Sequence, residues 1–141
     1  KYNLLIGERT AEQVKIEVGS AFPLDTPRTM EIKGRDLMEG VPKAVIISDE
    51  EILQRLLYPM VNEGAKILEE KLAIRASDID VIWVYGYGWP VYRGGPMFWA
   101  DSIGLKVIRD RMLEWQRKHG DVWKPAALVD RLVSEGKGFL A

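Results

Sequence analysis

The stretch SDEEILQRLLYPMVNEGAKILEEKL, residues 48–72, decides the fold class of this chain. Ser48 and Glu51 form a capping-box sequence that predicts a helix start. Apolar residues then recur at helical spacing, so the stretch is expected to be one long amphipathic helix. Pro59 removes a backbone donor inside it and predicts a kink, and Gly64 weakens it further. The apolar stripe consists of Leu53, Leu57, Val61, Ala65, Leu68 and Leu72.

The residues before this helix predict a helix and a β-hairpin. Thr10 and Gln13 form a second capping-box sequence, and Gly19 is a natural stop for the helix that follows. Residues 29–37 alternate between apolar and charged side chains, and residues 44–47 are apolar and mostly β-branched. These two stretches are predicted to pair as antiparallel strands.

The residues after the long helix predict only further helices. A short helix is expected from Ser77 towards Tyr85, and Pro96 suits the first turn of the next one, which should end near Gly104. Two more are expected over residues 105–119 and in a last segment that Gly136 stops. We therefore predict an α+β fold in which residues 1–50 form a helix and β-hairpin subdomain. Residues 51–141 form an all-helical bundle, joined to it through the Pro-kinked helix.

The composition excludes several classes of function. The 20 basic and 21 acidic residues give a net charge of −1, so no one-signed field favours nucleic acid. The chain has no cysteine, which excludes disulfides, thiolate catalysis and cysteine-ligated zinc. No apolar run approaches the length of about 20 residues that spans a bilayer. We expect a cytoplasmic protein without a transmembrane segment or a nucleic-acid partner.

The segment Gly86-Tyr87-Gly88 invites comparison with a dinucleotide-binding turn, because the apolar run of residues 81–84 precedes it. That fingerprint needs a third glycine or alanine three residues after the second, and Val91 stands there instead. An ordered aromatic loop between helices is the better interpretation.

Three other sets of polar residues are candidates for chemistry. His119, the only histidine, lies beside Gly120 where a helix is expected to end, which favours a capping role over catalysis. Arg93 either binds an anion or stacks on Trp89 or Tyr92. The acidic pairs are interpreted as turn and helix-start residues. No catalytic set and no metal cluster is predicted. The acidic pairs are Asp36 with Glu39 and Asp78 with Asp80.

The N-terminal residues carry a family resemblance. The segments NLLIGERTAEQVKIEVGSAFP (residues 3–23) and MEIKGRDLMEGVP (residues 30–42) closely resemble the bacterial rod-shape protein MreB, an actin-like ATPase that forms membrane-associated filaments. The resemblance covers about residues 1–50 and implies the small subdomain beside the nucleotide cleft. It makes Glu12 and Lys15 the candidate nucleotide-binding residues, with ATP–Mg as the cofactor of that family. It does not include the family's phosphate-binding loops.

The remaining residues resemble a second family. The segments LYPMVNEGAKILEE (57–70), RASDIDV (75–81), GYGWP (86–90) and YRGGPMF (92–98) are similar to the last helical domain of multifunctional β-oxidation enzymes. Those enzymes join enoyl-CoA hydratase to NAD-dependent 3-hydroxyacyl-CoA dehydrogenase. The resemblance implies that the NAD site and the catalytic His-Glu pair belong to an upstream module. The matched domain packs against that module, so no catalytic residue is assigned in this chain.

Three functional hypotheses follow from the two resemblances. The leading one is a non-catalytic chimeric or designed scaffold, because both families begin a helix near Ser48 and can share it. The second is an accessory C-terminal part of a 3-hydroxyacyl-CoA dehydrogenase, and the third is an MreB-like cytoskeletal fragment that binds nucleotide weakly. We expect no catalysis and no bound cofactor for the chain alone, although NAD, acyl-CoA and ATP–Mg serve the parent families. Exposed apolar surface left by absent neighbours predicts self-association, as a dimer.

Overall fold

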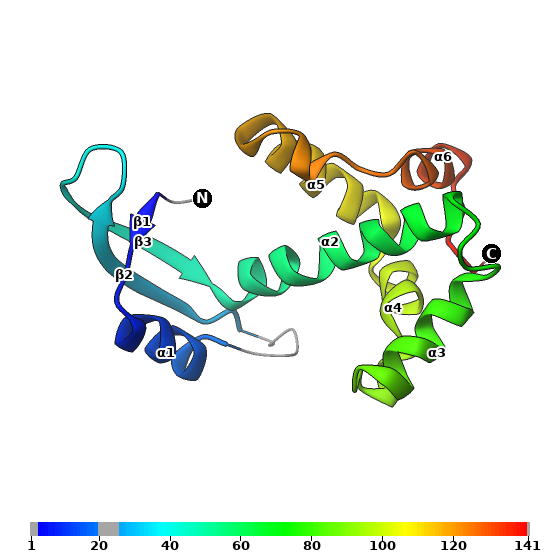
Figure 1. Cartoon of the computed structure of the whole chain (residues 1–141), viewed down its shortest axis with the longest axis horizontal. Helices are drawn as coiled ribbons and strands as arrows, with labels where there is room; N and C mark the ends of the chain where they lie inside the picture. Colours follow the sequence, from blue (N-terminus) through cyan, green and yellow to red (C-terminus); the bar gives the residue numbers. More distant parts are fainter. Residues whose placement is uncertain (1–2, 20–25, 141) are drawn as a thin grey trace. The chain divides into compact units, whose positions relative to one another are not determined.

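A computed structural model describes residues 3–19 and 26–140 of the chain. Packing divides the chain into two compact units, residues 1–56 and residues 57–141, and the division falls inside one helix, α2 (Asp49–Glu69). In the described residues three strands pair as an antiparallel sheet and the other regular elements are helices (Figure 1), so the predicted α+β fold is confirmed.

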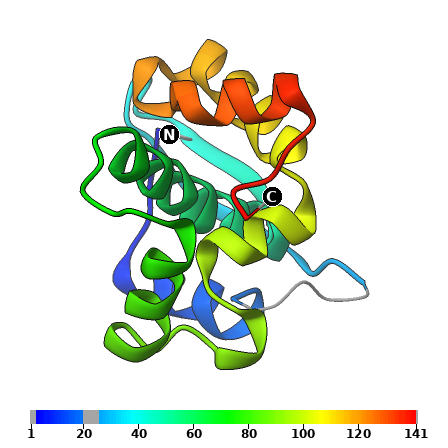
Figure 2. The ribbon, with the colours of Figure 1, turned by 90° about the vertical axis from the view of Figure 1, so that its right-hand side faces the viewer.

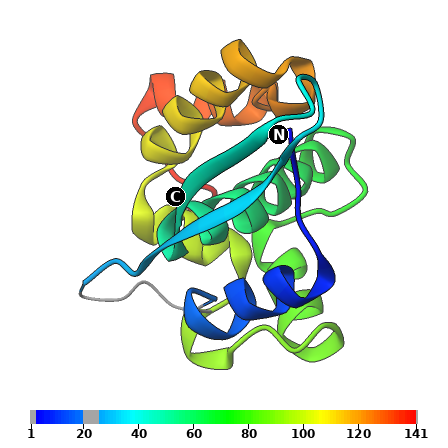
Figure 3. The same cartoon turned by 90° about the vertical axis from the view of Figure 1, so that its left-hand side faces the viewer.

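The N-terminal unit contains helix α1 (Glu8–Glu17) and the strands β1 (Leu4–Leu5), β2 (Thr29–Asp36) and β3 (Pro42–Ser48) in the order β1-β2-β3. Strands β2 and β3 form the predicted hairpin and lie side by side in Figure 3. The strand pattern places Ile32 and Ile47 on the buried face, where Val18 is also buried. These side chains are the core of the unit.

Two sequence expectations in this unit were wrong in detail. Helix α1 begins at Glu8 after Gly7, and no side chain caps it, so the predicted Thr10 capping box is absent. Gly7 is the N-cap residue and has an extended backbone, so the helix begins at Glu8, before Thr10. Strand β3 begins at Pro42 rather than Ala44, because the turn at residues 37–41 is short. Gly19 follows the last turn as predicted, and its N–H donates to Val14 at 3.1 Å.

Helix α2 begins where the sequence predicted. Ser48 Oγ accepts a 3.1 Å hydrogen bond from the backbone N–H of Glu51, and Asp49 Oδ1 accepts one of 3.1 Å from Arg28 N–H. The Glu51 side chain pairs with Arg55 instead of returning to Ser48, so only half of the capping box forms. Pro59 lies inside the helix, which continues to Glu69.

The C-terminal unit is a helical bundle around the second half of α2 (Figures 1 and 2). Its helices are α3 (Ala76–Gly86), α4 (Pro96–Ile103), α5 (Leu105–His119) and α6 (Ala127–Glu135), with short 3-10 turns η1 (Val91–Arg93) and η2 (Asp121–Trp123). Their bounds match the predicted glycine and proline signals at Pro96, Gly104, Gly120 and Gly136. Tyr58 and Val61 of α2 pack against α4 and α5, while Ala65 packs against α6.

Gly64 has a packing role, although glycine disfavours the interior of a helix. A Cβ atom at this position would lie 2.6 Å from Met97 Sδ, and Met97 is fully buried. The glycine therefore lets α4 approach α2 closely, which offsets its cost to the helix.

Candidate functional site

The predicted nucleotide residues lie one turn apart on α1. Lys15 Nζ donates to Glu12 Oε1 at 3.4 Å, and the two side chains are 75% and 58% exposed. Such an exposed pair adds little stability and offers one cation and one anion to solvent. Their nucleotide binding stays a prediction.

The other polar candidates have structural surroundings. Arg93 lies over the ring of Tyr92, 5.8 Å from its centroid, so the stacking interpretation is confirmed. His119 is the exposed last residue of α5, before Gly120. The residues before Gly86 are helical in α3, so no strand precedes the Gly86-x-Gly88 segment and the dinucleotide interpretation is excluded.

The hairpin turn depends on Asp36, which is buried at the end of β2. Asp36 Oδ1 accepts hydrogen bonds from the backbone N–H groups of Met38 (2.8 Å) and Glu39 (3.2 Å), and Lys43 Nζ donates to Oδ2 at 2.7 Å. The hydrogen bond from Lys43, followed by those from the turn, lowers the pKa of Asp36 to about 2. The predicted acidic pair at residues 36 and 39 is therefore a turn device.

Asp80 is a buried carboxylate that sequence reasoning assigned to the wrong element. It lies inside α3, yet it accepts hydrogen bonds from the backbone N–H groups of Met97 (2.7 Å) and Phe98 (3.2 Å) at the start of α4. Burial raises its pKa, and the two backbone donors oppose that shift. The residue thus caps a neighbouring helix, and only Asp78 caps α3 itself.

Asn62 fixes the connector before α6 to the middle of α2. Its side chain is buried; Nδ2 donates to the Lys124 carbonyl at 3.1 Å, and Oδ1 accepts from Ala126 N–H at 2.7 Å. Asp101 does the same for the C-terminal segment, where it accepts from Phe139 N–H (2.9 Å) and Leu140 N–H (3.0 Å). These hydrogen bonds join residues that lie far apart in the sequence, so the sequence alone does not show them.

All five tryptophans join one series of aromatic contacts in the helical unit. Trp83 and Trp89 lie 6.4 Å apart between ring centroids, Trp89 and Trp99 lie 6.2 Å apart, and Trp115 and Trp123 lie 4.7 Å apart. Tyr58 bridges Trp99 and Trp115 at 6.2 and 6.0 Å. These rings fill the core, so the aromatic loop is a packing feature as predicted.

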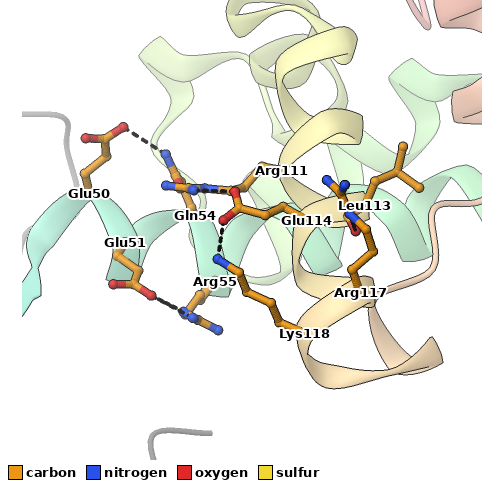
Figure 4. A network of polar contacts seen from close by, with 9 residues as sticks. All are labelled: Glu50, Glu51, Gln54, Arg55, Arg111, Leu113, Glu114, Arg117 and Lys118. Carbon is orange, nitrogen blue, oxygen red and sulfur yellow. Dashed lines mark hydrogen bonds and ion pairs between the residues drawn. The ribbon is translucent and has the colours of Figure 1, made fainter. Parts of the chain in front are cut away.

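The charged helix surfaces are paired within single helices. On α5, Glu114 accepts from Lys118 and Arg111, which lowers its pKa to about 2, and on α2 Glu51 pairs with Arg55 (Figure 4). Within residues 3–19 and 26–140, no group of three metal-ligating side chains is present. These ion pairs stabilise the helices in which they lie.

A hollow of about 380 Å³ lies in the helical unit. Most of its lining is apolar, and Arg75 is paired with Asp78 at 2.8 Å. The charged group of the lining is therefore held in an ion pair. Its lining residues are Leu68, Ile74, Arg75, Ala76, Ser77, Leu128, Leu132, Phe139 and Leu140.

Comparison with known families gives two matches. Residues 1–83 match the family model for MreB/Mbl protein, and residues 52–138 match that for the 3-hydroxyacyl-CoA dehydrogenase C-terminal domain. The matches overlap over residues 52–83, which include most of α2 and α3. A crystal structure of MreB5 of Spiroplasma citri bound to ADP is 47% identical, covering 40% of this chain and 17% of that chain with a TM-score of 0.38.

Similar curated proteins are much longer than this chain. The glyoxysomal fatty acid beta-oxidation multifunctional protein MFP-a of Brassica napus is 41% identical over 95 residues, 67% of this chain and 13% of that protein. The peroxisomal bifunctional enzyme of Homo sapiens is 39% identical over 92 residues, 64% of this chain and 13% of the enzyme. The peroxisomal multifunctional protein AIM1 of Arabidopsis thaliana is 36% identical over 118 residues, 81% of this chain and 16% of that protein.

Proposed function

We propose a non-catalytic packing role for this chain, which belongs to the 3-hydroxyacyl-CoA dehydrogenase C-terminal domain family over residues 52–138 and to the MreB/Mbl family over residues 1–83. Its helical unit serves as the accessory C-terminal domain of a β-oxidation dehydrogenase. The catalytic chemistry and the NAD site belong to a partner module that this domain supports.

One observation carries this proposal: the buried polar side chains of the helical unit bind backbone. Asn62 holds the connector to α6, and Asp80 holds the first turn of α4. They are the two buried polar residues among those described in this unit. A catalytic acid or base needs its proton-transfer atoms directed at substrate, whereas these atoms are occupied by N–H and C=O groups.

The surface of α3, η1 and α4 supports a role in packing against a partner. Large apolar side chains there are more than half exposed, and an exposed apolar patch often marks a site that binds another protein. Tyr85 and Tyr92 are 84% and 72% exposed and combine an apolar ring with a polar tip, as interface residues often do. We define this surface as the α3–α4 patch: Val81, Ile82, Tyr85, Val91, Tyr92 and Phe98.

Complementation tests the proposal. The full chain is mixed with the Arabidopsis thaliana multifunctional protein MFP2 shortened to end before the region that aligns with this chain. NAD-dependent oxidation of a 3-hydroxyacyl-CoA and the melting temperature are then measured. We expect addition of the chain to raise the oxidation rate and the melting temperature of the shortened protein. The chain alone should show no turnover.

Two variants make the complementation specific. Tyr85→Glu places a charge in the α3–α4 patch and should abolish the effect. Val122→Glu is the matched control, because Val122 is similarly exposed at 81% but lies on η2, outside the patch. Turnover by the chain alone, or equal effects of both variants, would contradict the proposal.

The finer part of the proposal is that the chain is a chimera. The overlap of the two family matches on α2 supports it. The first turn of α2 is hydrogen-bonded to Arg28 beside the hairpin, and its later turns pack in the helical core. Amplification of the source DNA across the codons of residues 30–90 tests it. A single natural gene encoding these same residues without a junction would overturn the chimera.

Location and partners also remain proposals. Among the described residues, every helix is too short or too polar to be a candidate membrane span. The names of the plant relatives place those proteins in peroxisomes or glyoxysomes. The cytoplasmic location and the lack of a nucleic-acid partner stay predictions, and fractionation of the source cells would decide the first.

A further inference from the structure

The outer edge of β3 is the unpaired side of the sheet. Strand β3 (Pro42–Ser48) comes last in the order β1-β2-β3, and within residues 3–19 and 26–140 no strand pairs with its other side (Figure 3). An exposed strand edge presents a row of backbone donors and acceptors that another strand can pair with. The open edge of β3 can therefore pair with a strand of another chain.

The register identifies the edge atoms. Asp36 N–H donates to the Val41 carbonyl at 2.8 Å, and Asp49 N–H donates to Arg28 at 3.1 Å. In an antiparallel pair, hydrogen-bonded and non-hydrogen-bonded positions alternate. Lys43, Val45 and Ile47 are therefore bonded to β2. The backbone groups of Pro42, Ala44, Ile46 and Ser48 point to the open edge.

The centre of this edge has few of the features that normally block strand pairing. Pro42 lacks an N–H but lies at the strand end, and the Lys43 side chain is bonded to Asp36 at 2.7 Å. Ala44 is exposed and Ile46 is 69% exposed. A β-branched apolar residue on an open edge favours pairing with another strand.

We propose that β3 pairs antiparallel with β3 of a second copy of this chain, about a two-fold axis at Val45. This register overlaps the whole strand. Ala44 of each copy lies opposite Ile46 of the other, and both residues exchange N–H···O bonds. The Ser48 N–H donates to the Pro42 carbonyl at both ends, so the missing Pro42 donor leaves only the terminal Ser48 carbonyl without a partner.

Side chains agree with the same register. Cross-strand pairs place the small Ala44 opposite the large Ile46 on one face and Val45 opposite itself on the other, which are apolar contacts. A two-fold arrangement closes after two copies, whereas parallel pairing of one edge gives no closed assembly. The pairing makes one sheet of six strands from two copies, and it is independent of the proposed packing role of the helical unit.

Analytical ultracentrifugation of the full chain tests the proposal. The wild-type chain is expected to sediment at twice its 16.0 kDa mass at high concentration. Ala44→Pro removes an edge N–H that β2 does not use, and should raise the dissociation constant at least about tenfold. Ala44→Thr keeps the N–H at the same position and is the control that should still dimerise.

Amide hydrogen exchange of the wild-type chain gives a second readout that requires no variant. Protection of Ala44, Ile46 and Ser48 should rise with protein concentration, while Val45 and Ile47 should be protected throughout because they bond to β2. A wild-type monomer up to about 1 mM, equal dissociation constants for the two variants, or concentration-independent exchange at Ala44 and Ile46 would overturn the proposal.

Discussion

Asn62 Oδ1 accepts a 2.7 Å hydrogen bond from the backbone N–H of Ala126, 64 positions further along the chain. The same side chain donates to the carbonyl of Lys124, so one amide holds both sides of Pro125. Because Asn62 is buried, its loss leaves both backbone groups without their partner. The Asn62 side chain therefore adds two directional hydrogen bonds to the apolar contacts that pack α6 against α2.

Asn62→Ala should therefore destabilise the helical unit by about 2–4 kcal/mol, since each unsatisfied buried group costs about 1–3 kcal/mol. The melting temperature should fall by about 10–20 °C. Glu63→Gln is the matched control, because the neighbouring Glu63 side chain is 64% exposed and its change should have little effect. Equal melting temperatures for both variants would show that the Asn62 bonds are not structural.

Gly95→Ala should prevent α4 from docking on α3. Gly95 has φ of 97°, and a Cβ atom there would lie 2.3 Å from Asp80 Cβ. Gly88 has φ of 73° but open space around its Cβ position, so Gly88→Ala should cost only the backbone penalty of about 1–2 kcal/mol. Urea unfolding followed by tryptophan fluorescence, which reports the helical unit alone, measures both. Similar midpoints for the two variants would contradict the close contact between Gly95 and Asp80.

The stability of the N-terminal unit should fall as the pH drops from about 4 to 2. The Lys43 hydrogen bond and the turn N–H groups lower the pKa of Asp36 to about 2, below its ordinary value of 3.8. A carboxylate with a lowered folded-state pKa contributes stability above its unfolded pKa and loses it as the pH falls. Far-UV circular dichroism melts of the wild type and Asp36→Asn should differ most above pH 5.

The same comparison should show the difference shrinking as the pH falls through 2, because Asp36, with a folded-state pKa of about 2, then becomes protonated in the folded state as well. Glu39→Gln, on the same turn, serves as the control and should follow the wild type at every pH. A constant difference between the wild type and Asp36→Asn across the range would mean that the carboxylate charge has no role in the turn.

The parts of the fold that are encoded locally could be predicted from the sequence. Ser48 marks the start of α2, Pro96 the start of α4, and Gly120 and Gly136 the ends of α5 and α6, because capping and backbone conformation depend on a few adjacent residues. The predicted start of α1 was wrong. Thr10 is a residue type that often caps helices, but Gly7 has the extended backbone of the N-cap position.

The polar contacts of the helical unit could not be predicted in the same way. Asp80 looked like a helix-start residue of α3, but its partners lie on α4, and Asn62 has partners more than sixty positions away. The aromatic contacts among Trp83, Trp89 and Trp99 likewise depend on how three elements pack. A single sequence contains the residue types of these contacts but not their pairing.

A thermal melt of the full chain, alone and with ATP–Mg, NADH or acetoacetyl-CoA, tests the non-catalytic account most directly. A ligand present at 100 times its dissociation constant adds about 2.7 kcal/mol, which is a shift of several degrees at this size. We predict a cooperative melt that none of the three shifts. A rise with NADH or acetoacetyl-CoA would contradict the account. A rise with ATP–Mg that Lys15→Ala abolishes would also contradict it and assign the nucleotide site to Glu12 and Lys15.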